Sequence, residues 1–484
     1  MITTLLIFFP LLAGAVLLAM RRGKAAFGLS LAAAAGELVL SLYALSGFRS
    51  NAERQFEVNV SWIKSMGISF HAGMDGISLL LVLLTTFLSV IIIMTSYRRT
   101  FNKPALFYAL IMFMEGGLVG VFTAADGFLF YVFWELALIP VYFICLMWGG
   151  EGRERITLKF FIYTLAGSLL LLLGLLYLYL KTPVPHSFDI TALYEVPLTS
   201  SEQVWIFWAM FIAFAIKMPV FPFHTWQPDT YTAAPAQGTM LLSGIMLKMG
   251  VYGLIRWLIP VVPAGIQEWG YTALLLSVTG IVYASAIAIV QRDFKRLIAY
   301  SSIAHVGLIS AGVFSLNLQG LQGAVVQMLS HGVNVVGLFF VADILLLRTG
   351  TNDISGMGGI RNRAPWFATV FMIILLGAVA LPLTNGFVGE FLLLGAIYQR
   401  HAWMTAAAGL SVILGAVYML NSYQKIMLGE NNTKAAGFRD LDLHEKIIFI
   451  PVVAMVIGMG VYPAPILRIA EPALKAILVH AGLA

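Results

Sequence analysis

Residues 211–226, which read FIAFAIKMPVFPFHTW, hold the ionisable side chain best placed to do chemistry in this sequence. Lys217 lies in an apolar run long enough to enter a bilayer, and Pro219 and Pro222 follow it closely. A lysine at the centre of a membrane helix costs about 2.5 kcal/mol or more, so such residues usually face a polar interior and act there. Proline breaks the helix, which a membrane tolerates only where the freed backbone groups meet protein or a water-filled cavity. This combination is typical of an ion-transport site.

Further ionisable residues lie well inside apolar runs. The full set is Glu115, Glu135, Lys217, Lys248, His305, His331, Asp343 and Glu390. Burial disfavours the charged form of such groups, whereas an opposite charge nearby restores it. A carboxylate that moves relative to a lysine therefore changes the affinity of that lysine for a proton. The pattern predicts a proton path across the membrane.

Structural roles compete with this interpretation at most of these positions. Glu135 is compatible with a static ion pair, Lys248 with a side chain that snorkels to the surface, and both histidines with hydrogen-bonded core positions. Glu390 follows a glycine-rich break and is compatible with a hinge cap. The proline break beside Lys217 has no comparable structural explanation, so a transport role is favoured there.

Composition indicates the elements that must position these residues. Of the 484 residues, 60% are apolar and 11% are charged, with a mean hydropathy of +0.90. Since soluble domains carry about 25% charged residues, this is a polytopic membrane protein. Because about 20 apolar residues cross a bilayer, we expect an all-α fold with about fourteen transmembrane helices. Their expected ranges are approximately 2–20, 27–47, 76–97, 105–123, 126–148, 157–180, 204–222 (continuing brokenly to 231), 238–259, 269–290, 296–315, 320–347, 366–398 with a break, 403–424 and 446–467.

The basic residues predict the orientation of these helices. Nineteen lysines and arginines fall in odd-numbered connections, including Arg21, Arg22 and Lys434, and six fall in even-numbered ones. The positive-inside rule then places the odd connections in the cytoplasm and both termini on the periplasmic side of a bacterial cytoplasmic membrane. The apolar segment 2–20 has its basic residues behind it, so we expect a retained helix rather than a cleaved signal peptide.

An internal repeat is visible in the order of the expected helices. The fourth member of helices 4–8 is broken at Lys217, and the fourth member of helices 9–13 is broken within LPLTNGFVGEF, residues 381–391. Since five is odd, the second unit is expected to be inverted relative to the first, as in many transporters. We therefore divide the chain into 1–104, a first repeat 105–260, a second repeat 261–425, and 426–484.

Several classes of function are excluded by missing motifs. Cys145 is the one cysteine, so neither a disulfide framework nor an iron–sulfur cluster can form within the chain. Neither a P-loop nor a GxGxxG motif after a strand occurs, and no metal-ligand spacing joins the histidines. The net charge of +6 fits the orientation bias of the loops better than nucleic-acid binding.

Five motifs carry a family resemblance: FWELALIPVYF, FAIKMPVFPFHTWQPDTYTAAP, LLSGIMLKMGVYGLIR, QRDFKRLIAYSSIAHVG and TNGFVGEF. Together they resemble the antiporter-like membrane subunits of proton-pumping NADH:quinone oxidoreductase, respiratory complex I, over helices 3 to 14. Glutamate at position 390 and the short C-terminus are similar to the M type, or mitochondrial chain 4 type, rather than to the L and N types. Thr384-Asn385 departs from the Gly-Thr that many relatives have there.

The resemblance implies a role for each of the six principal residues. Glu135 would pair with Lys217, Lys248 would connect two half-channels, His305 and His331 would carry protons along a central axis, and Glu390 would be the exit-side donor. Flavin, iron–sulfur clusters and quinone would belong to partner subunits, with no cofactor in this chain. The partners would be other membrane subunits, especially the L-type and N-type, within the lipid bilayer.

Two other functions compete with a redox-driven proton pump. A subunit of a cation/proton antiporter complex would share the helices and the lysines, but lysine is typical of such relatives at the position of Glu390. A structural scaffold would not need several costly intramembrane charges.

Overall fold

The computed structural model describes residues 1–20, 23–430 and 437–483. Of the basic residues used above, Arg21, Arg22 and Lys434 lie outside the described residues. Within them, eleven helices are long and apolar enough to cross a membrane, and two shorter ones are also apolar. The fold is mostly helical, as predicted, whereas the number of fourteen spans stays a prediction.

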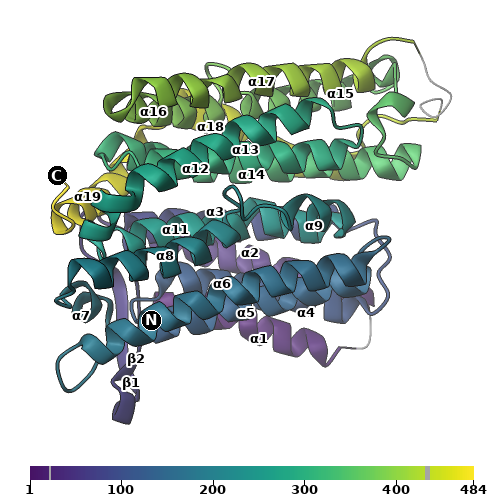
Figure 1. The fold of residues 1–484 in the computed structure, drawn as a ribbon. Coiled ribbons are helices and arrows are strands. Elements are labelled where there is room, and N and C mark those ends of the chain that lie inside the picture. The colour runs from purple at the N-terminus through teal and green to yellow at the C-terminus, as the bar shows by residue number, and fades with distance from the viewer. Residues whose placement is uncertain (21–22, 431–436, 484) are drawn as a thin grey trace.

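Figure 1 shows the helices lying side by side in two bundles. The first bundle and the segments that follow it are α1 (Ile2–Leu18), α2 (Gly23–Gly47), α3 (Gly76–Thr95), α4 (Pro104–Thr123), α5 (Gly127–Trp148), α6 (Arg153–Lys181), α7 (Ile190–Tyr194), α8 (Ser200–Lys217), α9 (Gln227–Ala233), α10 (Ala236–Leu241) and α11 (Leu247–Gly253). The second bundle comprises α12 (Pro263–Ile289), α13 (Phe294–Val313), α14 (Leu318–Thr349), α15 (Pro365–Ala378), α16 (Asn385–Arg400), α17 (Ala402–Met427) and α18 (Leu443–Val461). Helices α8 and α12 pack together across the two.

Both predicted breaks are present, and buried side chains satisfy the backbone there. Helix α8 ends at Lys217, and Trp226 Nε1 donates to the carbonyl of Ile216 at 3.0 Å. Between α15 and α16, His305 Nε2 lies 2.9 Å from the carbonyl of Ala378. These contacts give hydrogen-bond partners to backbone groups that a helix break leaves free, as the bilayer requires. The breaks fall in the fourth place of each proposed repeat, while the repeat boundaries themselves stay a prediction.

Two aspartates each cap the helix that follows them. The Asp75 carboxylate accepts from the backbone of Ile77 and Ser78 at the start of α3, and it pairs with Arg256. The Asp293 carboxylate accepts from the backbone of Arg296 at 2.8 Å at the start of α13. A short polar side chain before the first turn satisfies an otherwise free N–H group, so a local sequence signal is enough to predict it.

Two elements were not expected from the sequence. Strands β1 (Gln55–Ile63) and β2 (Ile68–Met74) form an antiparallel hairpin whose turn contains Gly67 at φ 59°. Helix α19 (Ala464–His480) follows α18 and packs on α3 and α14. In Figure 1 the hairpin, α19 and both termini lie at the same end of the helices. Both elements lie outside the long apolar runs on which the prediction was based.

The hairpin is fastened to the loop before α7 by a histidine between two carboxylates. His71 Nδ1 lies 2.6 Å from Asp189 Oδ2, and its Nε2 lies 2.5 Å from Glu57 Oε1. Burial opposes the charged imidazole, but the hydrogen bonds to Asp189 and Glu57 outweigh it and raise the pKa of His71. The charged form of His71 therefore holds the hairpin in place.

Candidate functional site

Lys217 is the last residue of α8 and is 1% exposed. Within the described part of the chain, its Nζ atom has no hydrogen-bond partner. The ammonium lies 5.2 Å from the ring centroid of Trp134 on α5, a cation–π distance. A buried amine held by an aromatic face, rather than by hydrogen bonds, keeps its three donors free for other groups.

Glu135 follows Trp134 on α5 and is half-buried. Its carboxylate acts electrostatically on Lys217, but because Lys217 Nζ bonds to none of the described residues, no hydrogen bond joins the two. The structure thus brings both residues close to Trp134 without closing an ion pair. The pairing of Glu135 with Lys217 stays a prediction.

Lys248 and His331 are in direct contact. Lys248 lies on α11 directly after the π-helical turn η2 (Leu242–Met246), and its Nζ donates to the Ser243 carbonyl at 2.7 Å. The same Nζ lies 2.9 Å from Nδ1 of His331 on α14, and the other ring nitrogen lies 2.9 Å from Ser302 Oγ. This geometry suits an ammonium that donates to a neutral imidazole, whose second nitrogen donates to the serine.

His305 and Glu390 form a second contact pair. Nδ1 of His305 on α13 lies 2.7 Å from the Ser301 carbonyl, whereas Nε2 faces the Ala378 carbonyl and lies 3.3 Å from Glu390 Oε1 on α16. Both nitrogens therefore face acceptors, a set that only a doubly protonated imidazole satisfies. Glu390 is 4% exposed and also contacts Gln327 at 3.5 Å.

A small polar cavity connects these two pairs. Its volume is about 20 Å³, enough for a water molecule, and both His305 and His331 line it with their rings 5.9 Å apart. Gln327 and Asn334 line it as well. Sequence reasoning missed these two residues, although their spacing of four and three around His331 places all three on one face of α14.

Two further carboxyl groups are fully buried between α2 and α4. Glu37 and Glu115 are both 0% exposed, and none of their oxygens has a hydrogen-bond partner among the described residues. Glu115 was singled out from the sequence and Glu37 was not. The structure places neither in contact with the lysine–histidine–glutamate chain described above.

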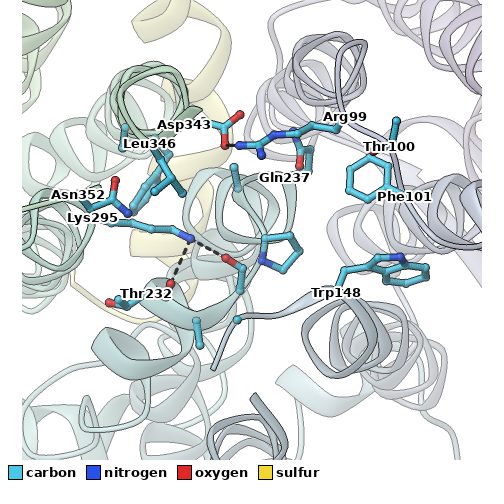
Figure 2. A pocket seen from close by; sticks show the side chains of 17 residues that line it. Arg99, Thr100, Phe101, Trp148, Thr232, Gln237, Lys295, Asp343, Leu346 and Asn352 are labelled. Carbon is cyan, nitrogen blue, oxygen red and sulfur yellow. Dashed lines mark hydrogen bonds and ion pairs between the residues drawn. The ribbon is translucent and has the colours of Figure 1, made fainter. Parts of the chain in front are cut away.

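Asp343, the remaining candidate, lies on the wall of a separate cavity of about 350 Å³. Figure 2 shows Asp343 paired with Arg99, and Lys295 reaching the carbonyls of Thr232 and Ala234 at 3.3 and 2.5 Å. The first contact joins α14 to the connection after α3, and the second joins α13 to the α9–α10 turn. Asp343 is therefore apart from His331, although both are on α14.

Two bundles with a broken helix in each, joined by a buried chain of lysine, histidine and glutamate, have the architecture of antiporter-like membrane proteins. Residues 124–415 match the family model described as NADH:quinone oxidoreductase/Mrp antiporter, TM. The chain belongs to this family.

Curated and solved relatives agree with this assignment. NADH-quinone oxidoreductase subunit M of Rickettsia conorii is 42% identical over 447 residues, covering 91% of this chain and 90% of the relative. A chain of respiratory complex I from Thermus thermophilus superposes with a TM-score of 0.92 at 32% identity, covering 100% of this chain and 99% of that one. A chain of the Mrp complex from Dietzia, at 18% identity and a TM-score of 0.86, shares the fold.

Proposed function

We propose that this chain is the M-type proton-translocating membrane subunit of an NADH-quinone oxidoreductase. The observation that carries the proposal is the buried chain Lys248–His331–Ser302 and His305–Glu390, within a fold that superposes on complex I along its whole length. Several ionisable groups inside a membrane protein are expensive and are kept for ion movement.

In this proposal protons pass along the buried chain, and electron transfer takes place in partner subunits. Lys217 is the central carrier of the first half, and its charge responds to the position of Glu135. Lys248 and the two histidines join the halves, and Glu390 releases protons. Flavin, iron–sulfur clusters and quinone belong to the partners, of which L-type and N-type subunits are the expected neighbours, and both termini lie on the periplasmic side.

Removing the Lys217 amine tests the proposal. Lys217→Ala should abolish nearly all NADH-driven proton pumping in an assembled complex, because it removes the buried amine at the end of α8. Proton uptake into inverted membrane vesicles, followed with a pH-sensitive dye, measures this directly. Lys64→Ala, at an exposed lysine of the hairpin turn, is the matched control and should pump normally. Near-normal pumping by an assembled Lys217→Ala complex would contradict the role.

Purification of the tagged chain in mild detergent tests the assignment to a redox complex. The assembly should carry bound flavin and oxidise NADH with quinone as acceptor. A flavin-free assembly that only exchanges cations for protons would replace the proposal with the cation/proton antiporter function.

A further inference from the structure

A third cavity lies among the ends of α12, α13 and α17, at the connections 290–293 and 350–364. Its volume is about 360 Å³. The polar residues that line it include Arg292, Ser355, Tyr418, Asn421, Ser422 and Lys425. A space of this size and polarity is large enough to hold several water molecules.

The cavity reaches from the surface to a buried phenol. Arg292 and Lys425 are exposed, whereas Tyr418 is 2% exposed. Tyr418 lies two helical turns before Lys425 on α17, which is about 10 Å along the helix. The charged side chains therefore stand at the exposed end, and the hydroxyl of Tyr418 lies deeper inside the protein.

The Tyr418 hydroxyl points away from the surface, toward the candidate site. It donates to Ser301 Oγ at 3.0 Å. Ser301 Oγ lies 3.4 Å from Nδ1 of His305, and Nε2 of the same ring lies 3.3 Å from Glu390. Hydroxyl groups both donate and accept, so this line of groups can conduct a proton.

We propose that Tyr418 and Ser301 carry protons between this cavity and the His305–Glu390 pair. The second half of the chain would then have its own access to the side of the membrane on which the odd-numbered connections lie, independent of the break at Lys217. The inference rests on the proposed function and deepens it by assigning Tyr418 a direct part in proton transfer.

Each transfer conserves protons along the line. A hydrated proton in the cavity binds the Tyr418 oxygen as the original phenolic proton moves to Ser301 Oγ. The doubly protonated His305 gives its Nε2 proton to the Glu390 carboxylate, and the neutral ring turns its bare nitrogen toward Ser301. The serine hydroxyl then passes its own proton to that nitrogen. Each hydroxyl gains and loses one proton, Glu390 becomes neutral, and His305 returns to its doubly protonated form.

The cavity in Figure 2, which is of similar volume, lacks such a connection. Its cationic groups are engaged by Asp343 and by backbone carbonyls, as described above. Within the described residues, the hydrogen bonds of Gln237 on that wall run to Thr95 and not to the histidines. The cavity at Tyr418 is therefore the better candidate for access to Glu390.

Hydroxyl removal in the assembled complex tests the inference. Tyr418→Phe and Ser301→Ala should each lower NADH-driven proton pumping several-fold and enlarge its solvent deuterium isotope effect, whereas Ser301→Thr, which keeps a hydroxyl, should restore both. Tyr423→Phe is the matched control, since Tyr423 lies on the same helix and donates to the Ala368 carbonyl instead. Pumping and isotope effect unchanged in Tyr418→Phe would overturn the inference.

The Lys217→Ala complex distinguishes a failure of this inference from a failure of the proposed function. If Lys217→Ala stops pumping while Tyr418→Phe pumps normally, the inference fails and the proposed function stands. If both variants pump normally, the proposed function itself fails. A structural role of Tyr418 alone predicts less assembled complex with an unchanged isotope effect, which would also overturn the inference.

Discussion

At the scale of single residues, the site is defined by how each buried charge is accommodated. Lys248 and His305 have hydrogen-bond partners for their polar atoms, whereas among the described residues Lys217 has only the face of Trp134. Since an unpaired buried charge is costly, the state of Lys217 depends strongly on the one carboxylate that acts on it, Glu135. We therefore expect the charge of Lys217 to respond to Glu135.

Neutralising Glu135 should lower turnover without preventing assembly. Glu135→Gln keeps the shape of the side chain but removes the negative charge that favours the charged form of Lys217. NADH:quinone reductase activity of the purified complex should fall several-fold, with normal subunit content on a native gel. Glu151→Gln, at an exposed carboxylate, serves as the control. Unaltered activity of Glu135→Gln would refute its modulating role.

At the scale of elements, the break after Lys217 depends on close helix packing. Helix α11 approaches α8 at Gly250, where an added Cβ would lie 2.7 Å from the Phe214 carbonyl and 2.8 Å from Met218 Cβ. Both distances are shorter than a real Cβ atom tolerates. The absence of a side chain at Gly250 therefore sets the distance between Lys217 and the helix that carries Lys248.

Gly250→Ala should therefore destabilise the subunit by about 1–3 kcal/mol, the usual cost of overpacking. Less assembled complex and a lower thermal unfolding temperature are expected, together with lower pumping per assembled complex because the two lysine-bearing helices separate. Gly409→Ala on α17, where nothing lies within 4 Å of the added Cβ, should change neither. Equal stability and pumping of the two variants would show that the close approach at Gly250 does not set the helix spacing on which they depend.

At the scale of the whole molecule, the helices form two bundles with distinct ends. The hairpin, α19 and both termini mark one end, and the connections rich in basic residues lie at the other (Figure 1). Termini at the same end require an even number of passes, which agrees with the alternation of charge in the loops. The positive-inside rule predicts that the end rich in basic residues faces the cytoplasm, and this orientation stays a prediction.

Cysteine labelling tests this orientation. Met66→Cys in the exposed hairpin turn should react with a membrane-impermeant thiol reagent from the periplasmic side, and Lys103→Cys only in inside-out vesicles. The native Cys145 is buried, so the parent protein supplies the unlabelled control. The opposite pattern would invert the topology.

The sequence by itself determined the features that depend on short stretches of chain. Apolar length predicts the helices, proline predicts the breaks at 218–226 and 379–384, and single aspartates predict the caps of α3 and α13, because each signal acts within a few residues. The buried positions of Lys217, Lys248 and Glu390 followed from the same apolar runs. The hairpin and α19 were not predicted, because neither lies in an apolar run long enough to indicate a transmembrane helix.

Only the tertiary structure decided which of these residues meet. His305 and Glu390 are 85 positions apart, and Tyr418 and Ser301 are 117 apart, so their contacts depend on how α13, α16 and α17 pack. Packing likewise left Lys217 without a hydrogen-bond partner among the described residues, and it placed Glu115 near Glu37, away from the lysine–histidine–glutamate site. Side-chain contacts between helices are fixed by the rotation and approach of whole helices, which no local pattern of residues specifies.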